Sequence, residues 1–152
     1  MRECTYRQAG TEAILEEFRR NEKTVHLSQE SPAYLAKEFG TARIRSAPLS
    51  ESAIVGAAIG LAGSGFRTVA SIGMATFGFV AMDQFMNQAA KITYMFGGQA
   101  KFPILYRMSN GLGSSAAAQH SINPYSMFMH VPGLRSCCPQ LPTTSRGFLR
   151  PL

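Results

Sequence analysis

Short apolar runs alternate with longer helix-patterned segments along this 152-residue chain. The apolar runs are typical of buried strands, and the segments between them place apolar residues at helical intervals. The expected strands cover 24–28, 42–46, 66–73 and 102–108. Strands that alternate with helices favour βαβ units. We therefore expect an α/β fold with a mainly parallel sheet flanked by helices.

The chain opens with a clear helix signal. Thr5 and Gln8 have the spacing of a capping box, and apolar residues follow at helical intervals as far as Asn21. This pattern predicts an amphipathic first helix. The stretch 29–40, between the first two expected strands, is predicted to be a loop with one helical turn.

Two further helices are predicted after the second and third strands. Ser50 is a good N-cap, and Glu51 falls in the first turn of a helix so rich in small apolar residues that we expect burial on most of its faces. A long helix is predicted over 76–96. Its expected core stripe is Phe77, Ala81, Phe85, Ala89 and Ile92.

Three chemically distinctive features each follow an expected strand. Glu51 follows 42–46, Phe77 follows 66–73, and a Gly/Ser-rich loop that contains His120 follows 102–108. The carboxyl ends of parallel strands share one edge, where ligands collect in open α/β sheets. We expect a site there, although Glu51 alone also fits a charge favoured by the helix dipole and Phe77 alone also fits a core residue.

Composition argues against several classes of partner. The net charge is +6, but no Lys/Arg cluster with interleaved aromatic residues is present, so we expect no nucleic-acid partner. No uncharged run is long and apolar enough to span a bilayer, and no signal peptide opens the chain. We therefore expect a soluble protein with no membrane partner, located in the bacterial cytoplasm or, with a transit peptide outside this sequence, in a mitochondrion or plastid.

Several catalytic and metal motifs are missing. The three cysteines, Cys4, Cys137 and Cys138, form neither a disulfide framework nor a metal-type CxxC, so no metal site is expected. "GLAGSG" closes a helix instead of opening one after a strand, and no Walker sequence is present. Glu51, Asp83, His120 and Ser121 show no recognisable triad spacing.

Three long motifs nevertheless resemble one family. "PLSESAIVGAAIG", "FGFVAMDQFMNQAAKITYMFGGQ" and "AAAQHSINPYSMFMHVPGL" are similar to the beta subunit of the thiamine-diphosphate-dependent 2-oxo acid dehydrogenase decarboxylating component. Pyruvate, branched-chain and acetoin dehydrogenase complexes share that subunit. The resemblance implies that residues 1–134 form the transketolase-like, pyrimidine-binding domain.

The resemblance also implies roles for individual residues. Glu51 matches the glutamate that hydrogen-bonds the aminopyrimidine ring nitrogen of thiamine diphosphate, and Phe77 the aromatic residue that packs on that ring. His120 matches an active-site histidine for substrate binding or acyl transfer to lipoate, and Glu30 a second carboxylate near the cofactor. The implied activity is oxidative decarboxylation of a 2-oxo acid, pyruvate first.

The implied assembly leaves only half a site on this chain. A partner alpha subunit holds the diphosphate and its magnesium, in a heterotetramer with the beta subunit. A lipoyl acyltransferase component then receives the acyl group, and a small 2-oxo acid is the substrate.

The sequence departs from the family pattern in three places. The segment between Glu30 and Gly40 is shorter, and Ser71 and Thr76 stand where acidic residues are common. From Ser136 the sequence reads "SCCPQLPTTSRGFLRPL". Its prolines make it a poor strand, so 135–152 is expected to be an aberrant tail. A truncated or frameshifted product, catalytically inactive and at most a binding module, is therefore the alternative hypothesis.

Overall fold

Four parallel strands form a single sheet at the centre of the fold. The structure is a computed structural model that describes residues 3–111, 113, 115–139, 141 and 143. The strands are β1 (Thr24–Ser28), β2 (Ile44–Ser46), β3 (Arg67–Met74) and β4 (Ile104–Ser109). Their order across the sheet is β2-β1-β3-β4, and every neighbouring pair is parallel. The expected α/β fold with a parallel sheet is confirmed.

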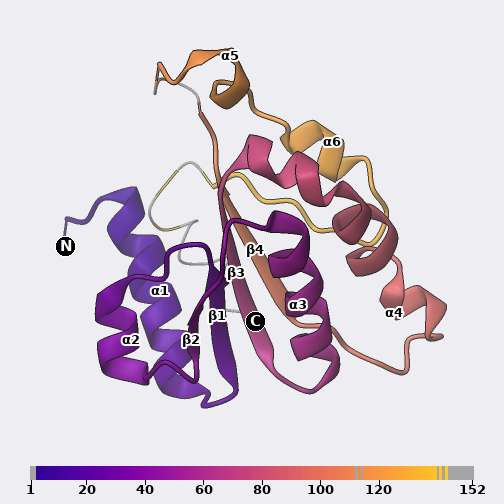
Figure 1. Ribbon diagram of the computed structural model, residues 1–152, viewed down its shortest axis with the longest axis horizontal. Coiled ribbons are helices and arrows are strands. Elements are labelled where there is room, and N and C mark those ends of the chain that lie inside the picture. The colour runs from indigo at the N-terminus through magenta and orange to yellow at the C-terminus, as the bar shows by residue number, and fades with distance from the viewer. Residues whose placement is uncertain (1–2, 112, 114, 140, 142, 144–152) are drawn as a thin grey trace.

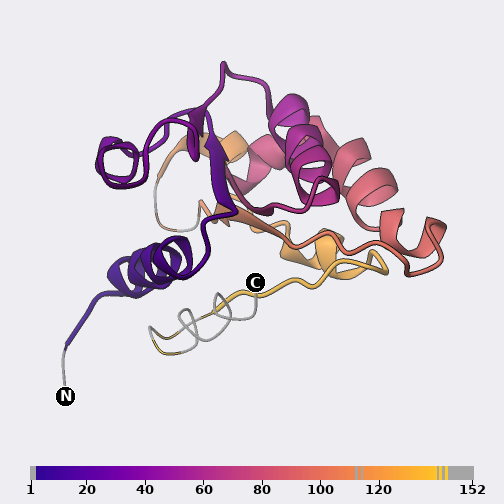
Figure 2. The same cartoon turned by 90° about the horizontal axis from the view of Figure 1, so that it is seen from below.

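Helices lie on both faces of this sheet (Figures 1 and 2). The α-helices are α1 (Tyr6–Arg20), α2 (Ala33–Phe39), α3 (Glu51–Gly63), α4 (Ile92–Met95), α5 (Ala117–His120) and α6 (Tyr125–Met129). A 3₁₀ helix, η1 (Ala75–Ala81), and a π-helix, η2 (Gln84–Ala89), follow β3. Helices α1 and α2 pack on one face of the sheet, and α3 with η1 and η2 on the other.

The first helix forms as the sequence predicts. The Thr5 amide donates to Gln8 Oε1 at 2.8 Å, and the Gln8 amide donates to Thr5 Oγ1 at 3.2 Å, which completes the capping box. At the other end, buried Glu17 pairs with Arg20 at 2.6 Å and with Arg67 at 3.1 Å. The second ion pair ties α1 to the start of β3.

Each face of the sheet has its own core. Successive residues of a strand point to opposite faces, so Val69 contacts α1 and α2 while Ala70 contacts α3. The α3-side core contains Leu27, Ile54, Val55, Ala58, Ala70, Ile72, Ala81, Phe85 and Phe128. The α1-side core contains Ala13, Ile14, Phe18, Leu35, Ile44 and Val69.

Two local predictions are wrong. The segment 29–40 holds the seven-residue helix α2 because Leu35 is buried beneath it, and Gly40 then ends it with a φ of +80°. The expected helix over 76–96 is instead a succession of η1, η2 and α4. In η1, Ala75, Gly78 and Ala81 are buried at intervals of three, which suits a 3₁₀ helix with its tighter period.

Helix α3 also differs in detail from its prediction. It begins at Glu51, but Ser50 Oγ donates to the Pro48 carbonyl at 3.0 Å and does not cap the helix. One side of α3 is open, since Ala53, Ala57 and Gly60 are exposed. The helix is therefore buried where it faces the sheet, η1 and η2, and open on its remaining side.

The predicted domain boundary falls after Leu134. That residue still packs against the α3-side core, and 135–139 contains neither helix nor strand. Residues 140, 142 and 144–152 of the predicted tail lie outside the described residues, so the boundary stays a prediction. Within the described ranges, no helix has the length and apolarity needed to cross a bilayer.

Replacing Phe85 with alanine should destabilise the fold by about 3–5 kcal/mol. Its ring is 1% exposed and lies 4.8 Å from the ring of Tyr106 and 5.4 Å from that of Phe128, centroid to centroid. Phe79→Ala is the control, because Phe79 is exposed. Chemical denaturation measures both free energies of unfolding, and equal losses would contradict the assignment of Phe85 to the core.

Candidate functional site

The residues predicted to form a site all follow strands at the carboxyl edge of the sheet, the upper edge in Figure 1. Glu30 follows β1, and Glu51 begins α3 after β2. Phe77 lies in η1 after β3, and His120 ends α5 after β4. The shared edge follows from parallel pairing of all four strands.

Glu51 is a buried carboxylate held from one side. Its side chain is 8% exposed, and Gln29 Nε2 donates to Glu51 Oε1 at 2.5 Å. No described residue hydrogen-bonds Oε2, which leaves that oxygen available to a ligand nitrogen. Gln29 was not among the site residues predicted from the sequence, although it follows a strand directly, as the other candidates follow theirs.

The next residue connects Glu51 to the helix that carries Phe77. Ser52 Oγ donates to the Val80 carbonyl of η1 at 2.8 Å. The start of α3 and the end of η1 are therefore held together, and no hydrogen bond joins Glu51 to the residues of η1 among the described residues.

Phe77 and His120 meet at this edge. Their ring centroids are 5.1 Å apart with the planes at 88°, an edge-on contact. Thr76 Oγ1 lies 3.5 Å from His120 Nδ1. A bulge near Gly73, whose φ is +83°, brings the end of β3 close to Phe77, and a Cβ there would lie 3.3 Å from Phe77 Cδ2.

A glycine sets the position of His120. Gly111 is buried, and a Cβ built on it would lie 1.4 Å from the carbonyl oxygen of His120. Only a residue without a side chain permits this approach. The loop after β4 therefore folds back on its own start and holds His120 against Phe77.

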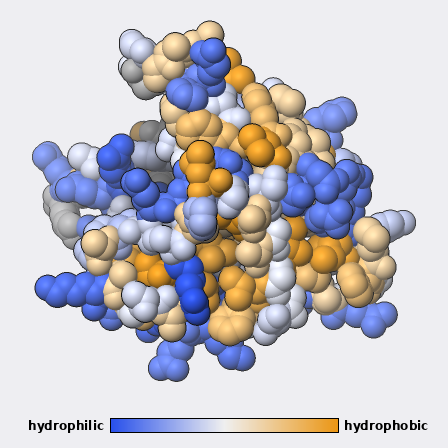
Figure 3. All heavy atoms as spheres, viewed as in Figure 1, coloured by the Kyte–Doolittle hydropathy of each residue, from blue (hydrophilic) through white to orange (hydrophobic). Residues whose placement is uncertain are grey.

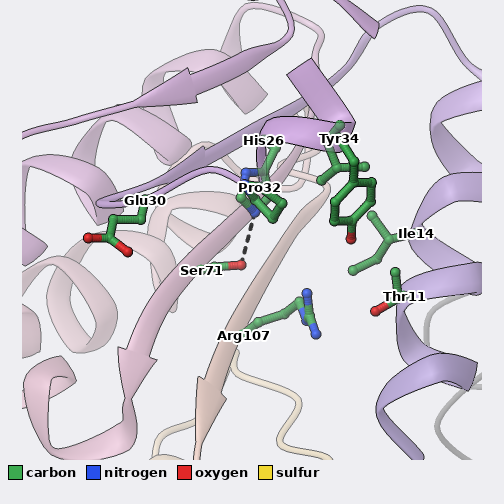
Figure 4. Close-up of a pocket in the computed structure, with 9 residues that line it drawn as sticks. Thr11, Ile14, His26, Glu30, Pro32, Tyr34, Ser71 and Arg107 are labelled. Carbon is green, nitrogen blue, oxygen red and sulfur yellow. Dashed lines mark hydrogen bonds between the residues drawn. The ribbon is translucent and has the colours of Figure 1, made fainter. Parts of the chain in front are cut away.

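Glu30 is the predicted site residue that stands apart. It is exposed, and no described contact joins it to Glu51, Phe77 or His120. Figure 4 shows its carboxylate directed away from His26 and Arg107. Elsewhere in the described ranges, no three His, Cys, Asp or Glu side chains are grouped closely enough to hold a metal ion.

The face of the sheet that α1 and α2 cover carries a buried, hydrogen-bonded histidine, His26. His26 is 3% exposed, with Nδ1 at 3.2 Å from Ser31 Oγ and Nε2 at 3.0 Å from Ser71 Oγ. Ser31 donates its own hydrogen to the Arg45 carbonyl at 2.8 Å, so it accepts from His26 Nδ1–H. In neutral His26, Nε2 then accepts the hydrogen of Ser71.

Gly111→Ala should displace His120 from Phe77, because the added methyl group cannot occupy the space of a carbonyl oxygen. The imidazole protons of His120 should lose the ring-current shift caused by Phe77 in a ¹H–¹³C NMR spectrum. Gly60→Ala is the control, since nothing lies within 4 Å of a Cβ there. An unchanged His120 signal in Gly111→Ala would show that the loop is not set by this approach.

Acidification should weaken the fold through His26. Burial, with a smaller contribution from the Arg107 cation, lowers the pKa of His26 from 6.5 to about 4. The unfolded chain binds this proton more readily, so stability is complete above pH 6.5 and falls by about 3 kcal/mol as the pH drops to about 4. Urea denaturation of wild type and His26→Gln between these pH values measures the loss, which should be absent from the variant.

Comparison with known proteins identifies the family of this chain. The sequence matches the family described as "Transketolase, pyrimidine binding domain" over residues 2–151. The beta subunit of acetoin:2,6-dichlorophenolindophenol oxidoreductase from Cupriavidus necator is 49% identical over 107 residues, which cover 70% of this chain and 32% of that protein. The pyruvate dehydrogenase E1 component subunit beta from Rickettsia felis is 35% identical over 156 residues, covering 97% of this chain and 48% of that protein.

A solved structure shares the fold. It is titled "Split gene transketolase, inactive beta4 tetramer", with a TM-score of 0.75 and 20% sequence identity over 95% of this chain and 46% of that one. The chain spans about a third to a half of the length of the two curated relatives described above. Because the family match covers nearly every residue, this chain belongs to the transketolase pyrimidine-binding domain family.

Proposed function

We propose that this chain supplies the pyrimidine-binding half of a thiamine diphosphate site in the beta subunit of a 2-oxo acid dehydrogenase. The buried Glu51, with one oxygen held by Gln29 and the other without a bond from a described residue, carries the proposal. The family match and the beta-subunit relatives support it. The activity proposed for the whole enzyme is oxidative decarboxylation of a 2-oxo acid, pyruvate first, in the bacterial cytoplasm.

The residues at the carboxyl edge fit an aminopyrimidine. Glu51 Oε2 is placed to share one proton with a ring nitrogen in a hydrogen bond, and Gln29 fixes the orientation of the carboxyl group by bonding Oε1. Phe77, half-buried near the start of η1, offers an aromatic surface to a planar ring. Thiamine diphosphate, when bound, supplies the electron sink for loss of carbon dioxide.

His120 and Glu30 are proposed at the edge of the same site. His120 is held by Phe77 and by the approach of Gly111, so its ring has a fixed place from which to bind substrate or assist acyl transfer. Glu30 is exposed after β1, where a partner subunit or a conformational change would have to bring it to the cofactor.

The proposed partner is an alpha subunit that holds the diphosphate and its magnesium ion. The relatives' names specify a beta subunit, which implies another subunit in those enzymes. The surface of this chain also suits a partner. Small residues line the open side of α3, and Val80 is exposed on the neighbouring η1. Figure 3 shows hydrophobic atoms spread over this side.

Acetoin is the second candidate substrate. The acetoin-oxidising relative is 49% identical where it aligns, compared with 35% for the pyruvate dehydrogenase relative, although over a shorter stretch. If pyruvate is the substrate, a lipoyl acyltransferase accepts the acyl group after decarboxylation. Comparing acetoin with pyruvate in the assay below separates the two.

Glu51→Gln should lower the rate of the assembled enzyme at least about 100-fold, since a general acid–base group contributes at least that much. The full chain is co-expressed with the alpha subunit of a pyruvate or acetoin dehydrogenase. Reduction of 2,6-dichlorophenolindophenol is then followed with and without thiamine diphosphate. Glu38→Gln is the control, because exposed Glu38 only pairs with Arg19 on the surface.

Two outcomes would contradict the proposal. Full activity of Glu51→Gln would remove Glu51 from the chemistry. No activity of the wild-type chain with any alpha subunit would favour the alternative, an inactive product that acts at most as a binding module.

A further inference from the structure

A small polar cavity lies on the face of the sheet that α1 and α2 cover, away from Phe77 and His120. Its volume is about 100 Å³, and it lies between these helices and the strands β1, β3 and β4. Its polar lining comes from Thr11, His26, Tyr34, Ser71 and Arg107, with Glu30 at its edge (Figure 4).

Arg107 enters this cavity without a partner in the described part of the chain. It lies on β4 directly beside Ser71 of β3, and Figure 4 shows its guanidinium group directed toward Thr11 of α1. No described residue forms a hydrogen bond or ion pair with it. Partial burial lowers its pKa, yet a guanidinium group stays charged in proteins. A half-buried cation without a counter-charge is costly, and an anion would relieve that cost.

The remaining polar groups around Arg107 favour an anion. Ser71 already donates its hydrogen to His26, whose other nitrogen is bonded to Ser31. The hydroxyl groups of Thr11 and Tyr34 carry hydrogens that no described acceptor takes. The cavity therefore holds more free donors than acceptors.

We propose that this cavity binds a small carboxylate through Arg107. A planar guanidinium group matches the two oxygens of a carboxylate in a bidentate pair. The volume limits the ligand, because a cavity of about 150 Å³ holds one benzene molecule. A carboxylate of about four non-hydrogen atoms, such as acetate, fits within 100 Å³.

The Ser71–His26 pair resembles a nucleophile and base for hydrolysis, but its surroundings favour binding of an anion in the cavity over that chemistry. A serine nucleophile would transfer its proton to His26, which would then be a cation. The positive charge of Arg107 and the buried position of His26 both oppose that charge. The same geometry favours a bound anion, which offsets the charge of Arg107.

The test is an NMR titration of the isotope-labelled 152-residue chain with sodium acetate, without thiamine diphosphate. The signals of Arg107 Nε–H and the His26 ring should shift and saturate. The pKa of His26 should rise when acetate is present, because the anion offsets the nearby cation; the other titratable groups lining the cavity are Tyr34 and Glu30. Pivalate, which is too large for the cavity, should cause no saturable shift.

Two matched variants identify the binding cation. Arg107→Gln should weaken acetate binding at least about tenfold, since a charge-assisted hydrogen bond is lost. Arg45→Gln makes the same change in net charge as Arg107→Gln. It should leave acetate binding unchanged, because Arg45 is exposed on β2. If Arg107→Gln does not fold, Arg107→Lys keeps the charge without the bidentate geometry and should weaken binding similarly.

Three results would overturn the proposal. The first is that the NMR shifts do not saturate by about 100 mM acetate, a concentration far above a millimolar dissociation constant. The second is that Arg45→Gln weakens acetate binding as much as Arg107→Gln does. The third is that pivalate binds as well as acetate. Because neither Glu51 nor the cofactor takes part, failure here would leave the proposed function of the carboxyl edge unaffected.

Discussion

Parallel pairing of β3 on both of its sides is the constraint on which the rest of the structure depends. β1 and β4 run in the same direction as β3, so the chain must return across the sheet after each strand. Every return begins at the carboxyl edge, where Glu51 and Phe77 lie, and the segment after the last strand, β4, carries His120 from the same edge. The candidate site is therefore a consequence of the sheet's topology.

Local contacts then refine what the topology supplies. Gln29 holds Glu51, the bond from Ser52 to η1 links the two sides of the edge, and Gly111 lets the last loop close on Phe77. On the other face of the sheet, the cavity contains the guanidinium group of Arg107, which has no hydrogen-bond or ion-pair partner among the described residues. The strand β3 therefore contributes to two chemically distinct environments. Phe77 of the carboxyl-edge site follows it, and its residue Ser71 lines the cavity that contains Arg107.

Much of the fold could be predicted from local sequence. The capping box of α1 and the apolar strand runs act over a few residues, so the pattern alone identifies them. Helix α2 was missed because a single buried contact, at Leu35, decides it. The segment after β3 was assigned the wrong helix types, since packing against the sheet sets its period. The Arg107 cavity depends on strand register, which local patterns do not contain.

The most direct test of the central claim is chemical-shift mapping with the pyrimidine fragment of thiamine, 4-amino-5-hydroxymethyl-2-methylpyrimidine, on the full chain. Binding at the carboxyl edge predicts perturbed signals of Gln29, Glu51 and Phe77, with nuclear Overhauser contacts from the fragment to the Phe77 ring. Perturbations confined to other surfaces, or none at millimolar fragment, would contradict the account.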